Sequence, residues 1–367
     1  MAVSTDRVRA GGSPTGRGLA AAVAGEASGS RDDAPALEHR LLDEFQRNFP
    51  LVQAPFAAIA HSLRTTEAWV LTTLSRLIDD GRVSRVGAVF RPGSVGASTL
   101  AAMAVPEARL AAVAELVSAH PEINHNYERE HHLNLWFVVT AADQARVIEV
   151  LAAIERETQL EVIPLPLIAD YYIDLGFGLE GGSRQFPSED LRQEKVVVVL
   201  DDYDRALLGE LQAGLPLVPR PFAVLGERSG WRGTMKEQEV IERIAQWVEC
   251  RAIKRFGVIV CHRALGFVAN AMCAWDVPSW DTDRLGRLLA REPVVTLCYQ
   301  RARAGEAWPY NLFCMIHGRS RRAVEAYLTA LSYRHGLDAY PHAVLFSRRA
   351  FKQRGARYVE PIEAAHG

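Results

Sequence analysis

Three side chains with complementary chemistry alternate along residues 123–129, whose sequence is INHNYER. If this stretch is a β-strand, His125, Tyr127 and Arg129 share one face, because successive side chains of a strand point to opposite sides. Together they offer an acid/base group, a phenolic proton donor and a clamp for an anion. A solvated strand with outward polar residues has the same pattern, and for any single one of these residues that alternative stays open.

A second stretch, VTLCYQR over residues 295–301, repeats the pattern with one change. Tyr299 and Arg301 stand 172 positions after the tyrosine and arginine of the first stretch, but Leu297 stands where the histidine would fall. A duplicated pair in which one copy lacks the only group that titrates near neutral pH is what a single asymmetric active site would produce. Neutral drift of an outward-facing residue is the alternative.

The repeat extends over most of the chain. Gly87 and Gly257 are 170 positions apart, and the offset grows in small steps to 177 at Pro164 and Pro341. Small steps are expected when insertions fall in surface loops. The sequence therefore predicts one unit of roughly 160 residues used twice, each copy large enough for its own core.

Basic residues are candidates for binding an anionic ligand. The chain has 42 Lys and Arg against 44 Asp and Glu, a net charge of −2, so it has no overall field for a polyanion. Arginines grouped locally would suit a ligand with several carboxylates. A run such as RRAFKQR over 348–354 is more often a solvated tail. The candidate ligand contacts are Arg85, Arg129, Lys254, Arg255, Tyr299, Arg301, Arg303, Arg349 and Lys352.

Composition excludes several other classes. No apolar run approaches the roughly 18 residues of a membrane span, and no N-terminal run fits a signal peptide. We expect a cytoplasmic protein that does not bind membranes. The five cysteines are an odd number without a C-x-x-C pair. They indicate reduced thiols, several of them in the core, rather than a metal site.

Periodicity predicts an α+β fold in which a winged helix-turn-helix and a ferredoxin-like βαββαβ domain occur twice. The strands expected to carry the candidate residues are Val83–Phe90, Ile123–Arg129, Ala252–Val260 and Val294–Arg301, and the last strand is expected to end at Phe346. The expected divisions are a disordered tail over 1–36, winged helix-turn-helix domains over 37–90 and 200–260, ferredoxin-like domains over 91–177 and 261–358, and a linker over 178–199.

A winged helix joined to a ferredoxin-like domain is also typical of transcription regulators, so DNA binding has to be weighed. A recognition helix needs Arg or Lys for phosphates and base edges. The candidate helices are acidic instead: residues 66–80 carry Glu67, Asp79 and Asp80 against Arg76, and residues 235–250 carry four glutamates. These helices disfavour DNA as a partner.

The motifs HNYERE and NLWF in the first half, with CYQR, WPYNLFCMIHG and FSRRAFKQRGA in the second, resemble those of the siroheme decarboxylases. The likeness covers about residues 37–358 and is greatest to the fused two-half form of d1-type haem biosynthesis. It implies an Lrp/AsnC-like fold and removal of the acetate carboxyl groups at ring positions 12 and 18 of siroheme. It implies no cofactor beyond the iron tetrapyrrole substrate, and other proteins of haem d1 biosynthesis as partners.

The chemistry of that reaction fits the candidate residues. The macrocycle can accept the electron density left by departing carbon dioxide, so the protein must hold carboxylates, exclude water and deliver a proton. Arg85, Arg129, Arg255 and Arg301 are the expected clamps. His125 is the expected proton donor, and Tyr127 orients it or donates in its place. His131, in the turn after the strand, matches the second histidine of the family and is a donor or an iron ligand.

One departure from the family concerns the second half. Related sequences often carry a histidine before the cysteine of this motif, where the chain has Leu297. We therefore expect one pocket in which the second half mainly positions the substrate. Two alternatives remain: a haem-responsive Lrp/AsnC-type regulator that binds tetrapyrrole as a signal, and a carrier that leaves the pigment unchanged.

Overall fold

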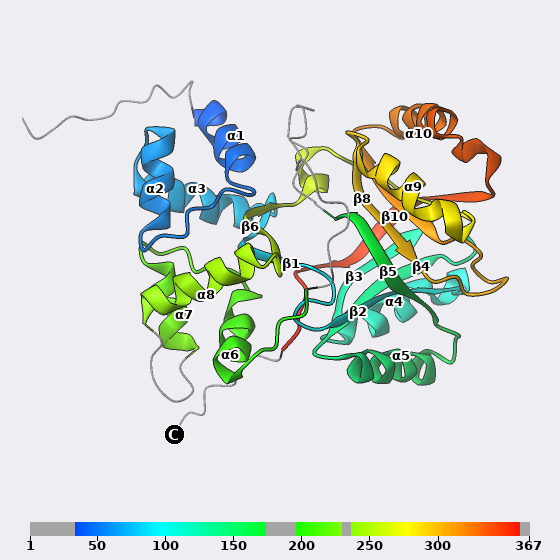
Figure 1. The fold of residues 1–367 in the computed structure, drawn as a ribbon, viewed down its shortest axis with the longest axis horizontal. Coiled ribbons are helices and arrows are strands. Elements are labelled where there is room, and N and C mark those ends of the chain that lie inside the picture. The colour runs from blue at the N-terminus through cyan, green and yellow to red at the C-terminus, as the bar shows by residue number, and fades with distance from the viewer. Residues whose placement is uncertain (1–33, 174–195, 230–235, 360–367) are drawn as a thin grey trace, which may run out of the picture.

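The computed structural model describes residues 34–173, 196–229 and 236–359 (Figure 1). Most of the expected tail, and residues 178–195 of the expected linker, lie outside the described residues. Residues 34–36, expected to belong to the tail, instead open helix α1 (Ala34–Glu44). None of the described helices is long and apolar enough to cross a membrane.

The two winged helix-turn-helix units pack against each other around one shared core. That core includes Leu41, Phe56 and Leu74 from the first unit and Leu207 and Phe222 from the second. Thr66 caps its helix by accepting a hydrogen bond from the Trp69 amide (3.2 Å). The first unit comprises α1, α2 (Pro55–Leu63), α3 (Glu67–Asp79) and β1 (Val83–Phe90), and the second α6 (Asp202–Leu211), α7 (Pro221–Arg228), α8 (Glu237–Glu249) and β6 (Ile253–Val260).

The wing strands β1 and β6 pair with each other as an antiparallel ribbon, with Gly87 opposite Gly257. A Cβ at Gly257 would lie 2.3 Å from the Phe45 carbonyl oxygen, so no larger residue fits there. The same carbonyl accepts a hydrogen bond from the Val258 amide (2.8 Å). The repeated glycine thus allows the ribbon to lie against the chain that follows α1.

Each ferredoxin-like half forms a four-stranded antiparallel sheet with its helices on one side (Figure 1). The first half has the strand order β3-β4-β2-β5 and the second β8-β9-β7-β10. The elements of the first half are β2 (Ala97–Met103), η1 (Glu107–Arg109), α4 (Leu110–Ala119), β3 (Ile123–Arg129), β4 (Leu135–Ala141), α5 (Gln144–Thr158) and β5 (Ile163–Ile173). Those of the second are η2 (His262–Leu265), β7 (Ala269–Trp275), α9 (Ser279–Ala290), β8 (Val295–Arg301), β9 (Leu312–Gly318), α10 (Arg321–His335), η3 (Leu337–Ala339) and β10 (His342–Gln353).

The two sheets join into one closed eight-stranded barrel because the last strand of each half crosses to the other half. Strand β5 pairs with β2 through residues 163–166 and with β8 through 167–173. Strand β10 pairs with β7 through residues 342–346 and with β3 through 347–353. The expectation that the last strand ends at Phe346 and that RRAFKQR is a solvated tail is therefore wrong. The backbone groups of this run complete the edge of β3.

Alternation along the barrel strands separates two environments. Outward side chains pack under helices, as Ile123 and Phe137 do in the first half and Cys314 and Ile316 do in the second. Inward side chains form a separate apolar cluster that includes Trp136, Trp308, Phe313, Met272 and Leu345. This cluster fills part of the barrel interior.

Candidate functional site

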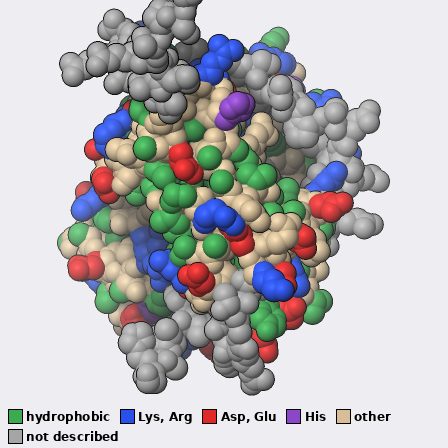
Figure 2. Space-filling model, turned by 90° about the vertical axis from the view of Figure 1, so that its left-hand side faces the viewer, with side chains coloured by type: hydrophobic (Ala, Val, Ile, Leu, Met, Phe, Trp, Pro, Cys, Tyr) green, Lys and Arg blue, Asp and Glu red, His purple; other side chains and the backbone are tan. Residues whose placement is uncertain are grey.

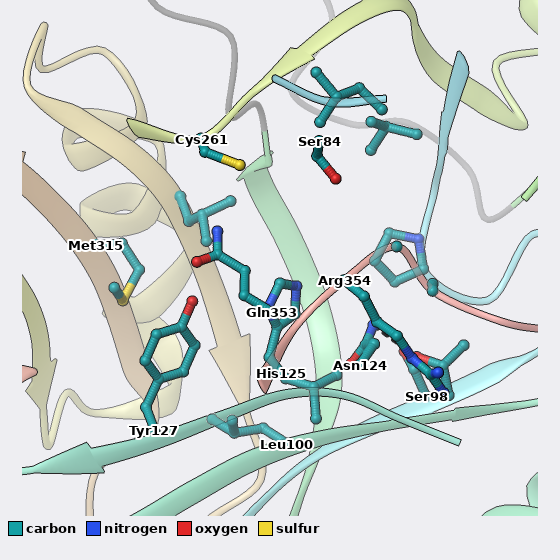
Figure 3. A pocket seen from close by; sticks show the side chains of 18 of the residues that line it. Ser84, Ser98, Leu100, Asn124, His125, Tyr127, Cys261, Met315, Gln353 and Arg354 are labelled. Atoms are coloured by element: carbon teal, nitrogen blue, oxygen red, sulfur yellow. Dashed lines mark hydrogen bonds between the residues drawn. The ribbon is translucent and has the colours of Figure 1, made fainter. Parts of the chain in front are cut away.

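A cavity of about 350 Å³ lies between the barrel interior and the β1–β6 ribbon, a volume in the range of small-molecule sites. His125 and Tyr127 extend into it from β3, and Ser84 of β1 and Cys261, just after β6, face them across the space (Figure 3). The C-terminal segment 353–358 closes another side, fixed by the hydrogen bond from the Arg354 amide to the Asn124 carbonyl (2.8 Å). Each of the two winged helix-turn-helix units and each ferredoxin-like half contributes lining residues to this one cavity.

The His-Tyr-Arg trio of β3 faces the cavity as the alternation predicts. The rings of His125 and Tyr127 are stacked, with centroids 6.1 Å apart, and the guanidinium of Arg129 lies 5.5 Å from the Tyr127 ring centroid. Arg129 is buried, and its Nη1 donates to the Leu345 carbonyl of β10 (3.1 Å). This bond fixes the guanidinium at the point where β10 passes from one half to the other.

The second half places its equivalent residues in the same cavity. Arg301 lies over the Tyr299 ring at 4.6 Å, and its Nη1 donates to the Leu165 carbonyl of β5 (2.7 Å), at the other crossover. Leu297 lines the cavity at the position that corresponds to His125. The barrel therefore presents two tyrosine–arginine pairs and a single histidine on the two equivalent strands.

A bulge modifies the alternation just before each trio. The pairing register slips between Ile123 and His125 on β3, and between Val295 and Leu297 on β8. Asn124, expected to point away with Asn126, instead lines the cavity, while Asn126 does point away and donates to the Ala114 carbonyl of α4 (3.0 Å). The bulge thus places in the cavity a polar side chain, Asn124, that strict alternation would direct to the other face of the strand.

The cavity is strongly cationic in a nearly neutral protein. Among the described residues that line it there is no Asp or Glu, but there are six arginines: Arg85, Arg129, Arg255, Arg263, Arg301 and Arg354. Buried nitrogens of four of these, the Nε atoms of Arg85, Arg129, Arg301 and Arg354, have no hydrogen-bond partner in the protein. Buried donors without partners are costly and indicate a site built for an external acceptor.

Arg85 is held in a narrow slot between backbone segments. A Cβ at Gly355 would lie 2.6 Å from its Nη1, and a Cβ at Gly214 would lie 3.0 Å from the Arg85 Cβ. Its Nη2 donates to the Ala88 carbonyl (3.0 Å). Glycines on both sides therefore allow this guanidinium to lie near enough for its charge to act on the imidazole of His125.

The surroundings set the protonation states of the trio. Burial, and next the positive charge of Arg85, lower the pKa of His125 to about 4, so the imidazole is neutral in the ligand-free protein at neutral pH. Burial raises the pKa of the Tyr127 phenol, which therefore keeps its proton. Burial lowers the pKa of Arg129 and Arg301, but an arginine starts so high that both stay charged.

Four basic residues from the sequence-based set lie outside the cavity. Lys254 is paired with Asp170 (2.8 Å), and Arg303 with Asp276 (2.6 Å). The guanidinium of Arg349 lies 4.7 Å from the centroid of the Phe351 ring. The ammonium of Lys352 donates to the carbonyls of Ser118 and His120, and burial lowers its pKa to about 8. These contacts are structural, and the fold does not bring the four residues to the cavity.

His131 is also separate from the trio. Its Nδ1 accepts a hydrogen bond from the Leu133 amide (3.1 Å), and its ring packs edge-on against Trp308 with centroids 5.4 Å apart. It lines a second pocket beside Glu128 and Arg348 rather than the cavity. The structure therefore does not bring His131 together with His125, because its ring packs against Trp308 and lines the second pocket.

Sequence reasoning missed two cavity residues, His317 and Asn270. The Nε2 of His317 on β9 lies 2.8 Å from the Nδ2 of Asn270 on β7. The signal was present in FCMIHG, where His317 alternates with the inward Phe313 and Met315. The repeat gave no signal for this histidine, because at the offset of 177 the first half has Thr140 at the corresponding position.

The winged-helix end of the molecule shows Lys and Arg interspersed with Asp and Glu rather than a continuous basic surface (Figure 2).

All five cysteines are free thiols, and Cys273, Cys298 and Cys314 are buried. Within the described ranges, no group of three or more His, Cys, Asp or Glu side chains could hold a metal ion.

Two family models match the chain, each twice. An AsnC-like ligand binding domain matches residues 94–171 and 264–352, and a siroheme decarboxylase NirDL-like HTH domain matches residues 38–83 and 204–253. These ranges fall within the ferredoxin-like and winged helix-turn-helix parts of each half. The matches reproduce the duplication deduced from the repeated motifs.

Individual relatives are similar over most of the chain. The siroheme decarboxylase NirDL subunit of Paracoccus denitrificans is 47% identical over 88% of this chain and 98% of its own length. The siroheme decarboxylase of Hydrogenobacter thermophilus is 30% identical over 87% and 94%. A crystal structure of the siroheme decarboxylase NirDL superposes with a TM-score of 0.64 at 27% identity, over 88% and 94%. A second, in complex with an iron-uroporphyrin III analogue, gives 0.63 at 26%, over 88% and 93%.

Proposed function

Because the chain belongs to the siroheme decarboxylase family, we propose that it removes the acetate carboxyl groups at ring positions 12 and 18 of siroheme as carbon dioxide, giving 12,18-didecarboxysiroheme. The family makes the chain an enzyme, a carboxy-lyase. A place in haem d1 biosynthesis, a cytoplasmic location and contacts with other proteins of that pathway belong to the same proposal.

The observation that carries the proposal is the cavity with six arginines and no carboxylate among its described lining residues. A tetrapyrrole presents an apolar plane with carboxylates around its rim. The cavity has the complementary arrangement, with Leu100, Trp136 and Met272 in its wall beside the guanidinium groups. Arg85, Arg129, Arg255 and Arg301 would each meet a rim carboxylate, because a guanidinium suits a carboxylate in charge and geometry.

Each decarboxylation consumes one proton and releases one carbon dioxide. The bond between the acetate methylene and its carboxylate breaks, carbon dioxide leaves, and the electron pair is delocalised into the macrocycle. A proton on that carbon then completes a methyl group. The reaction requires no oxidant, and we infer that it needs no cofactor beyond the iron tetrapyrrole itself.

His125 is the residue we propose as the proton donor, with Tyr127 beside it as a hydrogen-bond donor to the reacting group. His125 is neutral in the ligand-free cavity, so it can donate a proton only if substrate binding first protonates the imidazole. Carboxylates brought near the imidazole neutralise the charge of Arg85 and favour the imidazolium. The proton would therefore be loaded when the substrate binds.

Substrate binding is accordingly expected to take up protons. With a free-state pKa of about 4 for His125 and a higher pKa in the complex, the complex holds more protons, so affinity should fall as pH rises through this window. Titration calorimetry with iron-uroporphyrin III in two buffers of different ionisation enthalpy measures the uptake. A His125→Gln variant should take up less, and equal uptake by the two proteins would contradict the loading mechanism.

The function itself is tested by anaerobic incubation with siroheme and mass spectrometry of the extracted pigment. The expected result is loss of the mass of carbon dioxide twice. A bound pigment of unchanged mass would overturn the proposal and support a carrier or a haem-responsive regulator. A gel shift with operator-length DNA at several salt concentrations separates those two, because binding driven by phosphates weakens steeply with salt.

A further inference from the structure

The segment that follows the last strand brings a third tyrosine to the cavity. Strand β10 ends at Gln353, and residues 354–358 then run along the cavity without regular secondary structure (Figure 3). Tyr358 lines the cavity and is 6% exposed. At the offset of 177 the sequence of the first half has Gly181, so only one copy of the repeat supplies this phenol.

Contacts with the winged-helix units fix the position of Tyr358. Its amide donates to Oε1 of Gln212 (2.9 Å), the residue that ends α6, and Nε2 of Gln212 donates to the Val359 carbonyl (2.6 Å). Its ring packs edge-on against Phe90 of β1, with centroids 5.8 Å apart. A Cβ at Gly96 would lie 2.7 Å from Cδ1 of this ring, so the glycine makes room for it. The phenol is therefore held in place before a ligand binds.

The hydroxyl of Tyr358 is available as a hydrogen-bond donor. Among the described residues it has no hydrogen-bond partner. Burial raises the pKa of Tyr358 to about 12, against an opposing effect of the Arg85 charge, so the phenol keeps its proton at neutral pH. A protonated phenol donates to a carboxylate without repelling it.

Arg85 lies near both this phenol and the imidazole of His125. Its charge acts on the pKa of Tyr358 and, after burial, on the pKa of His125. Its Nε is buried and has no partner in the protein. A carboxylate that accepts from this guanidinium therefore comes close to both rings. The proton from His125 goes to the carbon next to the departing carboxylate, so the carboxylate at Arg85 is the one that leaves.

The orientation of that acetate decides whether it reacts. The breaking bond must stand perpendicular to the macrocycle, because only then does its electron pair enter the conjugated system. A guanidinium alone holds the carboxylate but leaves the acetate free to turn about its bond to the ring. A second donor from another wall of the cavity removes this freedom.

We infer that Tyr358 is a specificity-determining residue whose hydroxyl donates to the acetate carboxylate held by Arg85 and so fixes the acetate beside His125. This rests on the proposed function. A propionate carries its carboxylate one carbon farther from the ring, and its decarboxylation would leave an electron pair that the macrocycle cannot accept. A subsite that accepts an acetate at this point therefore directs the reaction to a group that is able to react.

The test compares Tyr358→Phe with the wild type. Loss of one hydrogen bond to a charged group should weaken binding of iron-uroporphyrin III about 10–150-fold, measured by absorbance titration. At saturating siroheme, the first decarboxylation should slow about 10–100-fold, because the acetate is no longer aligned. The matched control is Tyr171→Phe. Tyr171 is equally buried, but its hydroxyl bonds Asp283 outside the cavity, so pigment affinity and rate should stay unchanged.

A double-mutant cycle shows which carboxylate the hydroxyl meets. Tyr358→Phe and Arg85→Gln should be strongly non-additive in affinity, because both act on one carboxylate, whereas Tyr358→Phe and Arg301→Gln should be additive. Iron-coproporphyrin III has methyl groups in place of the acetates. It should bind to Tyr358→Phe as tightly as to the wild type.

The contrary results are distinct. Unchanged affinity or rate in Tyr358→Phe, additivity with Arg85→Gln, or an equal loss of affinity for iron-coproporphyrin III would each overturn the inference and leave the proposed function standing. The phenylalanine keeps the ring, so chemical denaturation should show unchanged stability. A less stable variant would mean that the hydroxyl bonds within the protein, which also overturns the inference. Wild-type enzyme that removes no carboxyl would overturn the function itself.

Discussion

Replacing His125 by glutamine should lower the rate of the first decarboxylation by about 10²–10⁴-fold, the usual contribution of a positioned general acid. Binding of siroheme should lose only the part of its affinity that comes from protonation of the imidazole, so affinity should fall much less than the rate. The measurement is a single-turnover time course of pigment mass, with affinity taken from an absorbance titration. A loss of rate that exceeds the loss of affinity identifies a group that acts after binding.

The control for His125 is His120→Gln, a histidine just before β3 that contacts Glu157 rather than the cavity (3.1 Å). It should decarboxylate at the wild-type rate. If His125→Gln kept that rate as well, Tyr127 would become the proposed donor, because its protonated phenol lies beside the imidazole. Tyr127→Phe would then have to show the loss.

Loss of a cavity arginine should mainly weaken binding. Arg301→Leu removes a charged donor for a rim carboxylate, and a charge-assisted hydrogen bond contributes about 1.5–3 kcal/mol, so affinity for iron-uroporphyrin III should fall about 10–150-fold. The change also leaves the Leu165 carbonyl without its donor, which should cost roughly 1–3 kcal/mol of folding free energy. Absorbance titration and chemical denaturation measure the two effects separately.

Arg303 provides a matched control two residues away. Its guanidinium is paired with Asp276 and lies outside the cavity, so Arg303→Leu should leave affinity for the pigment unchanged. Equal weakening by the two substitutions would show that general surface charge, rather than the cavity, attracts the ligand. Raising the ionic strength should weaken the wild type less than expected for an exposed site, because buried charges are poorly screened.

Local patterns predicted the elements that carry the trio with good accuracy. Strand β3 has the expected bounds, and its alternation placed His125, Tyr127 and Arg129 on one face. These features depend on neighbours along the chain, so a single sequence contains them. The repeat added the second tyrosine–arginine pair, because duplicated strands occupy equivalent places in the fold.

Features that depend on distant partners could not be predicted. The sequence predicted Lys254 and Arg303 as ligand contacts, but in the fold they form ion pairs with Asp170 and Asp276, which are distant in the sequence. The run RRAFKQR looked like a tail because the edge of β3 that it pairs with is more than 200 residues earlier. The bulge that turns Asn124 into the cavity is likewise a property of the pairing between strands.

The crossing of β5 and β10 has an evolutionary consequence. In a barrel assembled from two identical polypeptides, each substitution would appear on both walls, and no wall could acquire a residue of its own. With both halves encoded in one gene, selection can act on each wall independently. Such independence permits an asymmetric cavity, with Leu297 and His317 on one wall where the other has His125 and Thr140. An asymmetric cavity suits a ligand whose substituents are themselves arranged asymmetrically.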